Sequence, residues 1–386
     1  MVGCEGDVNE EDPKYIGLRF MARSLMETSK SLHVIKHVFP SVVILVACFA
    51  CHNSPTQSLP EYPDTTSHNF VWFADTLGDG TSSDLLSVSI VSDTDVWAVG
   101  QIFLKDSNGA LSLPPHDVVH WDGKNWNLVD IGFPVYNYDC SLAYIQSTTG
   151  AVTFAFNSQS ILFTDGATVV RWNGTYLRYY PCIPRSLQSG AIFGIWGNSE
   201  DDFYIVGGGG MVFHYYNQFW HKLETGATAD IHDIWGAVEN GGTTILCAVS
   251  NQYSAGERKL LKVSSGDVVG SLSWSPQSEL KTIWFKSSSE IFVGGGALVT
   301  GNPAYWKVIN DLPLYYSEGI RGNDANDVFV VGDFGLCGHY NGSTWKSYSE
   351  VGLTDGIYYA VSSKSNFVVA VGQAGTRAIA IRGYRQ

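Results

Sequence analysis

The sequence predicts an all-β protein made of seven copies of one four-stranded sheet. Of its 386 residues, 41 are Gly, 13% are aromatic and only 16% are charged, whereas ordinary globular chains carry about 25% charged residues. Few charges with many Gly and aromatic residues favour sheets joined by tight turns. An apolar run closed by Gly or a small polar residue recurs along the chain, and its last copy lacks a final strand. We therefore expect almost no helix outside the N-terminus.

The N-terminus has the composition of an export signal. Lys30 and Lys36 precede an apolar run from Val38 to Ala50, which is too short to span a bilayer comfortably. We predict that residues 1–47 are a signal region. The first residues are acidic, which is unusual for such a signal, so Met21 and Met26 are alternative starts.

The apolar run ends in Leu45-Val46-Ala47-Cys48, which resembles a bacterial lipoprotein lipobox. The resemblance implies cleavage before Cys48 and diacylation of its thiol. Alternatives are an ordinary signal peptide cut near Ala50, modification of Cys51 and a transmembrane anchor. Phe49 stands where an Asp would favour the inner membrane, so the resemblance implies the outer membrane of the bacterial cell envelope. Residues 48–68 would be the lipidated Cys and a flexible tether without apolar periodicity.

The repeat is anchored on the residue that closes each apolar run. Anchors are roughly 40 to 57 residues apart, close to the period of four-stranded propeller blades. The anchors are Gly100, Asn157, Gly207, Ser250, Gly294, Gly332 and Gly372. Seven anchors predict seven blades. Six or eight blades remain alternatives, because the copies at Asn157 and Ser250 are degenerate.

Each copy has the same order of strands and turns. After the first strand comes an Asn/Asp-rich turn such as Asn323–Asn326, and then a run apolar on both faces, such as Val328–Val331, typical of a strand buried between sheets. A third strand ends in a pair such as Asn341-Gly342, which suits a two-residue hairpin turn, and a fourth begins at a Trp such as Trp345. The central aliphatic residues of the first strands are Val88, Ile145, Ile195, Ile234, Ile283, Ile320 and Val361.

The last copy stops after three strands, and the start of the domain resembles the missing fourth. Asn69–Thr76 reads NFVWFADT, with Trp72 in the place of the Trp of other fourth strands. Borrowing this strand would close the ring and remove a free edge. We therefore predict a seven-bladed β-propeller over residues 69–386, closed by an N-terminal strand. The three expected strands of the last copy are Ile357–Ser362, Phe367–Val371 and Arg377–Arg382.

The blades resemble a broad family of bacterial secreted propellers. Asp95–Gly100 reads DVWAVG, and Trp121–Trp126 reads WDGKNW, as in repeats of that family that end in Trp-Asp-Gly-x-x-Trp. More distant resemblances are to Asp-box (sialidase-like) propellers and to photosystem II assembly-factor propellers. The resemblance implies an architecture and leaves the activity open.

The sequence holds few signs of catalysis, metal or nucleic acid. The net charge is −14, and no cluster of Lys and Arg suits a phosphate backbone, so we expect no nucleic acid partner. His120, His214 and His339 share one position of the repeat, which favours packing residues that hydrogen-bond within the blade over metal ligands. We expect a monomer without cofactor or metal. We interpret the Asp pairs at 93/95, 201/202 and 324/327 as turn-forming residues. The alternative is that they bind calcium.

Four cysteines lie in the predicted propeller. Cys140 enters the second blade and Cys182 leaves it, so they are candidates for a disulfide in an oxidising periplasm. Cys247 and Cys337 lie in blade bodies, where we expect small apolar fillers.

The phase of the repeat also predicts a ligand site. The first strand of each blade should line a central channel, and one position two residues before its aliphatic centre is occupied by Leu86, Ala143, Phe193, His232, Lys281, Glu318 and Tyr359. Three successive blades place His232, Lys281 and Glu318 there. Arg321 stands where other blades carry Trp, and Asp233 and Tyr358 adjoin the arc. Such an arc suits a sugar, peptide or small anion; the alternative is a Lys–Glu pair that only neutralises itself.

Three long loops form a second candidate surface, because long ordered loops often carry function. Its aromatic contacts would be Tyr136 and Tyr138, with Tyr179 and Tyr180. The loops are Gln101–Asp117, Phe133–Asp139 and Tyr179–Gln188.

These observations predict a membrane-anchored lipoprotein whose propeller binds a protein or glycan at one face without catalysis. Two alternatives remain open. One is a periplasmic carbohydrate-active enzyme with carboxylates at the channel mouth. The other is an assembly or stability factor for a membrane complex.

Overall fold

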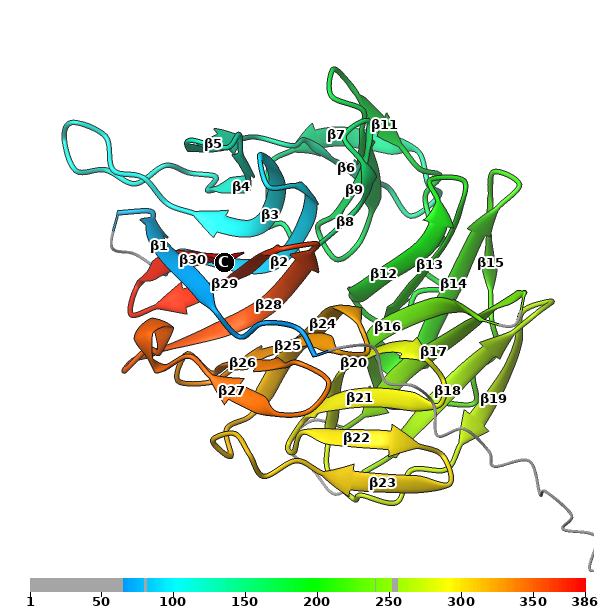
Figure 1. Ribbon diagram of the computed structural model, residues 1–386. Helices are drawn as coiled ribbons and strands as arrows, with labels where there is room; N and C mark the ends of the chain where they lie inside the picture. The colour runs from blue at the N-terminus through cyan, green and yellow to red at the C-terminus, as the bar shows by residue number, and fades with distance from the viewer. Residues whose placement is uncertain (1–64, 80–81, 240, 252–255) are drawn as a thin grey trace, which may run out of the picture. The chain divides into compact units, whose positions relative to one another are not determined.

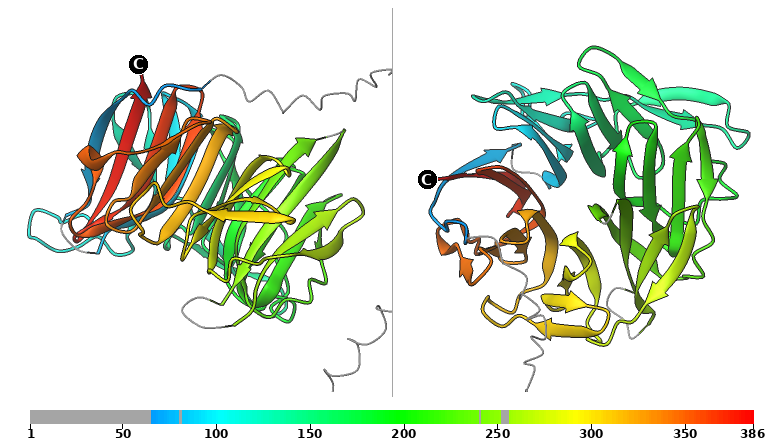
Figure 2. Two further views of the ribbon diagram at one scale, coloured as in Figure 1. Left: turned by 60° about the horizontal axis from the view of Figure 1, so that its bottom comes forward. Right: turned by 45° about the vertical axis from the view of Figure 1, so that its right-hand side comes forward.

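The computed structural model describes residues 65–79, 82–239, 241–251 and 256–386. Within these ranges the strands form seven four-stranded antiparallel sheets and one two-stranded sheet, and the seven sheets are arranged as the blades of a β-propeller (Figure 1, Figure 2). The described part contains no α-helix, only the 3-10 turns Gly208–Gly210 and Ser349–Val351. The all-β fold and the count of seven blades are therefore confirmed.

The predicted signal region, Cys48 and most of the tether lie outside the described residues. Among the residues that are described, no helix has the length and apolar character needed to cross a membrane.

Each blade runs from an inner strand at the channel to an outer strand. Blade one holds β2 (Asp84–Ser92), β3 (Asp95–Ile102), β4 (His116–Trp121) and β5 (Trp126–Val129). Blade two holds β8 (Val152–Asn157), β9 (Ser160–Thr164), β10 (Val169–Trp172) and β11 (Leu177–Tyr179). Blade three holds β12 (Ile192–Ser199), β13 (Asp202–Gly207), β14 (Met211–Tyr216) and β15 (Phe219–Lys222). Blade four holds β16 (Asp230–Glu239), β17 (Gly242–Ser250), β18 (Arg258–Ser264) and β19 (Val268–Leu272).

The remaining blades continue the series. Blade five holds β20 (Leu280–Ser287), β21 (Glu290–Gly295), β22 (Val299–Asn302) and β23 (Tyr305–Val308). Blade six holds β24 (Ser317–Asp324), β25 (Asp327–Gly332), β26 (Cys337–Tyr340) and β27 (Trp345–Ser347). Blade seven holds β28 (Gly356–Lys364), β29 (Phe367–Ala374), β30 (Arg377–Arg385) and β1 (Phe70–Leu77).

The ring closes through the strand borrowed from the N-terminal side, as predicted. β1 pairs antiparallel with β30 over its whole length, from Phe70 opposite Arg385 to Leu77 opposite Ala378, and Figure 1 shows the two strands side by side. Each inner strand also contacts the inner strands of both neighbouring blades, including β28 against β2. No gap is therefore left in the ring between blades seven and one.

The core lies between the blades, because the middle strands are buried on both faces. All six residues of β25 are buried, which agrees with its apolar run Val328–Val331. Between blades seven and one, for example, Val96 and Ala98 pack with Val369 and Val371. Cys247 and Cys337 are both buried in blade bodies, as expected for small apolar fillers.

Three histidines of the third strands bond within their own blades, as predicted from their shared repeat position. His120 Nε2 lies 2.9 Å from Asp95 Oδ1. His214 Nε2 lies 2.7 Å from Asp202 Oδ1, and His339 Nε2 lies 2.8 Å from Asp327 Oδ1. Each imidazole also stacks on an aromatic ring of the second strand. The stacked rings are those of Trp97, Tyr204 and Phe329.

Blade two departs from the predicted assignment. Ile145, expected at the centre of an inner strand, lies in the exposed strand β7 (Leu142–Gln146), which pairs only with β6 (Phe133–Tyr136) in a two-stranded sheet. The inner strand is instead β8, which was expected to be the second strand. It ends at Asn157, whose Oδ1 accepts a hydrogen bond from the Gln159 amide in a tight turn into β9. The short polar turn after Asn157 lets β8 pair with β9 as the inner strand of blade two. The hairpin of β6 and β7 precedes it and has an apolar sequence like that of an inner strand.

Candidate functional site

A β-bulge stands near the start of six of the seven inner strands. In each of these strands the pairing register skips one residue, which therefore has no partner opposite it in the ladder. Bulges redirect a side chain out of the regular pleat and are common beside functional sites. The skipped residues are Leu86, Phe193, His232, Lys281, Glu318 and Tyr359. The inner strand β8 of blade two begins in regular register.

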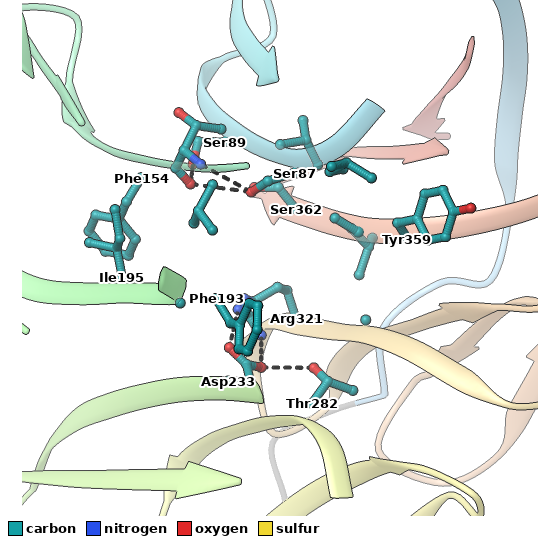
Figure 3. A pocket seen from close by; sticks show the side chains of 18 of the residues that line it. Ser87, Ser89, Phe154, Phe193, Ile195, Asp233, Thr282, Arg321, Tyr359 and Ser362 are labelled. Atoms are coloured by element: carbon teal, nitrogen blue, oxygen red, sulfur yellow. Dashed lines mark hydrogen bonds and ion pairs between the residues drawn. The ribbon is translucent and has the colours of Figure 1, made fainter. Parts of the chain in front are cut away.

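The six bulge residues lie at one end of a central cavity of about 610 Å³. The cavity is lined by inner strands of all seven blades, and Figure 3 shows part of this lining. Its walls combine the aromatic rings of Phe193 and Tyr359 with charged groups of both signs. We call the end formed by the six bulge residues the channel mouth.

Lys281 and Glu318 form an ion pair at the mouth. Lys281 Nζ lies 3.5 Å from Glu318 Oε2, and the side chains are 28% and 11% exposed. Burial raises the pKa of Glu318, the Lys281 ammonium lowers it, and the nearby Asp333 carboxylate raises it again. The balance is upward. The partly shielded Glu318 carboxyl is therefore influenced by one cation and by a second carboxyl group.

His232 is held in one tautomer by the backbone. Its Nε2 donates to the Ser250 carbonyl oxygen at 3.0 Å, which leaves Nδ1 as an acceptor while the ring is neutral. Burial first, and the Lys281 charge second, lower the pKa of His232 below its ordinary value. Its ring stacks near that of Phe193, with centroids 6.1 Å apart. At neutral pH the pair thus offers a flat, uncharged surface with one hydrogen-bond acceptor.

Asp233 and Arg321 form the wall of the cavity. The Asp233 carboxylate accepts from both terminal nitrogens of Arg321 at 2.9 Å each, and Figure 3 shows the two side chains facing each other. Thr282 Oγ1 and the Ile283 amide donate to the same carboxylate, each at 2.9 Å, and the Ile234 amide does so as well. Asp233 is only 7% exposed. Its lone pairs are already used inside the protein, so the predicted ligand role of Asp233 becomes a positioning role for Arg321.

Arg321 itself keeps a face toward the cavity. Its guanidinium carbon lies 4.9 Å from the centroid of the Trp235 ring, and its side chain is 27% exposed. The position carries Trp in blades three, four and five, and Trp284 of blade five is buried. With Arg in place of the indole, the Arg321 guanidinium of blade six extends past blade five to Asp233 of blade four.

The structure brings together most of the predicted site residues. His232, Asp233, Lys281, Glu318, Arg321 and Tyr359 line one cavity. Tyr358 does not belong to it, because its side chain is fully buried and its hydroxyl donates to the Val351 carbonyl at 2.8 Å. Ala143 lies in β7 and does not line the cavity either. Tyr358 differs because neighbouring residues of a strand face opposite ways. Ala143 differs because β7 is not the inner strand of blade two.

The second candidate surface is separate from the cavity. Tyr138 is exposed, while Tyr136 is half-buried and its hydroxyl lies 3.4 Å from the Tyr180 carbonyl oxygen. Cys140, in the turn between β6 and β7, is joined to Cys182 by a disulfide with Cα atoms 5.6 Å apart. Neither Tyr136 nor Tyr138 lines the cavity.

Several cavity residues were missed by the sequence reasoning. Ser87 and Ser89 both donate to the Thr153 carbonyl oxygen, at 3.5 and 3.0 Å, and Ser362 accepts from the Ile90 amide at 3.3 Å. These hydroxyl groups tie neighbouring inner strands together (Figure 3). The signal was the Ser identity of Ser89 and Ser362 at the position where blades three, four and five carry Trp. In the described part of the chain, no group of three or more His, Cys, Asp or Glu side chains is placed to hold a metal ion.

Comparisons with known proteins agree on the fold. No protein-family model and no curated protein matches the sequence. Among solved structures, "YCF48 bound to D1 peptide" has a TM-score of 0.59 at 14% identity and covers 83% of this chain and 99% of that chain. YCF48 from Cyanidioschyzon merolae has a TM-score of 0.55 at 14% identity, covering 81% and 98%. The WD40 β-propeller domain of Doa1 has a TM-score of 0.58 at 12% identity, covering 83% and 98%.

At these identities the likenesses show the fold alone. They agree with the distant resemblance of the blades to assembly-factor propellers. They also show that this architecture, at nearly full length, occurs in a protein bound to a peptide.

Proposed function

We propose that the protein is a lipid-anchored protein of the bacterial cell envelope whose propeller binds a polypeptide partner at the channel mouth, without catalysis. The observation that carries this proposal is the ring of bulge residues around the cavity, which places Phe193 and Tyr359 beside Lys281 and Glu318. Apolar surface with a few convergent polar groups is the usual make-up of a binding site. The likeness to a propeller bound to a peptide supports the choice of a polypeptide.

The first described residues lie at the end of blade six away from the mouth. Thr66 is bonded to Asn326 through its Oγ1 and to Asn341 through its amide. Both partners lie in turns at the end of blade six away from the channel mouth. The inner strand β24 begins beside Glu318 at the mouth and ends before Asn326, and Asn341 lies in the turn between β26 and β27 at that same end. Thr66 thus lies at the face opposite the channel mouth.

The carboxyl groups do not favour a glycosidase. Such an enzyme needs two carboxyl groups available to substrate as acid and as base or nucleophile. Here Asp233 accepts five hydrogen bonds from the protein, and Glu318 is paired with Lys281. A role in assembling a membrane complex would be one form of the proposed binding. A glycan is the second candidate ligand, because Phe193 is 40% exposed and offers a stacking face.

Binding selections with matched variants test this function. The purified protein would be screened against a phage-displayed peptide library and a glycan array, alongside Phe193→Ser and Glu318→Gln. Phe219→Ser is the control, since Phe219 is 67% exposed on the outer strand of blade three. We expect selected peptides whose affinity falls about tenfold in both mouth variants and is unchanged in the control. Peptide binding that survives both mouth variants would overturn the proposal, and glycan hits that depend on Phe193 would establish the second candidate.

The anchor has its own test. In cells that express the full chain, we expect incorporation of labelled palmitate that Cys48→Ser abolishes and Cys51→Ser leaves intact. Labelling that persists in Cys48→Ser would contradict the proposed anchor.

A further inference from the structure

Two loops extend the channel mouth outward with exposed apolar side chains: one leads from β23 of blade five to β24 of blade six, and the other joins β25 to β26. Leu314, Tyr315 and Phe334 are 81%, 42% and 57% exposed, and the rings of Tyr315 and Phe334 are 5.1 Å apart. The loops are joined by a hydrogen bond from the Asp333 amide to the Tyr316 carbonyl oxygen at 3.1 Å. We call Leu314, Tyr315 and Phe334 the rim patch. Apolar clusters bordered by charged groups are typical of interaction sites.

The rim patch keeps its shape at the cost of backbone strain. Phe334 has a φ of 53°, in the left-handed region that bulky side chains rarely adopt. Its carbonyl oxygen accepts from the Leu353 amide at 3.2 Å, and the Leu336 amide donates to the Asp333 carbonyl oxygen at 3.0 Å, so the turn is fixed at both ends. Strained conformations of this kind concentrate at functional sites. Phe334 is more than half exposed, so its contact with Tyr315 gives the fold little packing in return for the strain.

The charge beside the rim patch is negative in excess. Asp333 directly precedes Phe334 and lies close enough to Glu318 to raise its pKa. Burial raises the pKa of the Asp333 carboxyl as well, and no hydrogen bond or ion pair to that carboxyl group is found among the described residues. Four carboxylates and two cations line the cavity, an excess of two negative charges. The carboxylates are Asp165, Asp230, Asp233 and Glu318, and the cations are Lys281 and Arg321.

We propose that the rim patch and the Glu318 and Asp333 carboxylates together bind a segment of the partner that carries a Lys or Arg side chain next to an apolar residue. This inference rests on the proposed function, since it names the chemistry of the polypeptide at the same mouth. The apolar side chain would cover Tyr315 and Phe334, and the cation would reach the carboxylates that Lys281 alone does not neutralise. Complementary charge at such a rim selects partners and speeds their association.

A positional-scanning library of acetylated, amidated hexapeptides tests the proposal on the full-length protein. We expect retention to favour Lys or Arg beside Leu, Ile or Phe, and separate Lys and Arg positions show which cation is preferred. For the best-retained peptide, Asp333→Asn should weaken binding about tenfold and reduce its salt dependence. Phe334→Gly should weaken binding similarly without lowering the urea midpoint, because Gly relieves the left-handed strain. Phe219→Ser is again the control.

The outcomes separate this inference from the function on which it rests. A library that favours acidic or uncharged residues, or binding that is unchanged in both Asp333→Asn and Phe334→Gly, would overturn the inference. If that binding is still lost in Phe193→Ser, the mouth remains a polypeptide site. Retention of no hexapeptide at any position would contradict both proposals.

Discussion

Arg321 of blade six and Asp233 of blade four form a two-armed ion pair across the inner strand of blade five, with both N–O distances at 2.9 Å. The pair also involves blade five directly, because Thr282 Oγ1 donates to Asp233 and accepts from the Ile320 amide. Three successive blades are thus joined at the wall of the cavity. The same three blades supply His232, Lys281 and Glu318 to the channel mouth.

Arg321→Met should lower the free energy of unfolding by about 3 kcal/mol, because it leaves the Asp233 carboxylate buried without its cation. Urea denaturation followed by tryptophan fluorescence would measure the loss. The matched control is Arg178→Met, whose 3.2 Å pair with Asp201 is exposed on both sides, and which should cost less than about 1 kcal/mol. Equal losses in the two variants would show that the buried pair does not hold the blades together.

Phe70→Ala should destabilise the closure of the ring by about 3 kcal/mol. Phe70 is buried, and its ring makes edge contacts with Phe329, His339 and Tyr348 of blade six. The control is Val71→Ala in the same strand, whose side chain is exposed. Hydrogen exchange should rise in β1 and β30 of the Phe70 variant before it rises elsewhere. Uniformly faster exchange in all blades would argue against a local closing role for β1.

The stability of the closure should fall in acid through the histidine pair His68 and His339. His339 Nε2 donates to Asp327, so its Nδ1 accepts from His68 Nδ1 at 2.8 Å, and both rings are neutral. Burial and the neighbouring ring lower the pKa of His68 from 6.5 to about 4, and burial lowers that of His339. The unfolded chain then binds protons first. Stability is full above pH 6.5 and is lost as the pH falls toward 4.

His68→Gln should therefore reduce the drop in the urea midpoint between pH 7 and pH 4.5. Ser67→Ala, at the neighbouring non-titrating position, serves as the control and should keep the drop of the original protein. A His68→Gln variant with an undiminished drop would assign the acid sensitivity to other groups.

The repeat could be predicted from the sequence because each blade is specified locally. The Asx turn, the Gly anchor and the outer-strand Trp all act within about 40 residues. Blade two shows the limit of this reasoning. Leu142–Ile145 is apolar enough to imitate an inner strand, and only its pairing with β6 shows that it lies outside the ring.

The site was predictable to the extent that it follows the repeat. Counting two residues before each aliphatic centre identified all six bulge residues, since the bulge has the same place in each of those blades. The partner of Asp233 was not predictable, because Arg321 lies 88 residues away in sequence. The exposure of Phe334 and its left-handed backbone were not predictable either, because they depend on how the β23–β24 and β25–β26 loops meet.

The binding role of the channel mouth is tested most directly by photo-crosslinking in cells that express the full chain. A benzophenone amino acid would replace Phe193 at the mouth or, as the control, Phe219 on the outer strand of blade three. We expect a discrete adduct with a polypeptide from position 193, absent from position 219 and reduced by Asp333→Asn. No adduct from position 193, or equal adducts from both positions, would contradict a polypeptide site at the mouth.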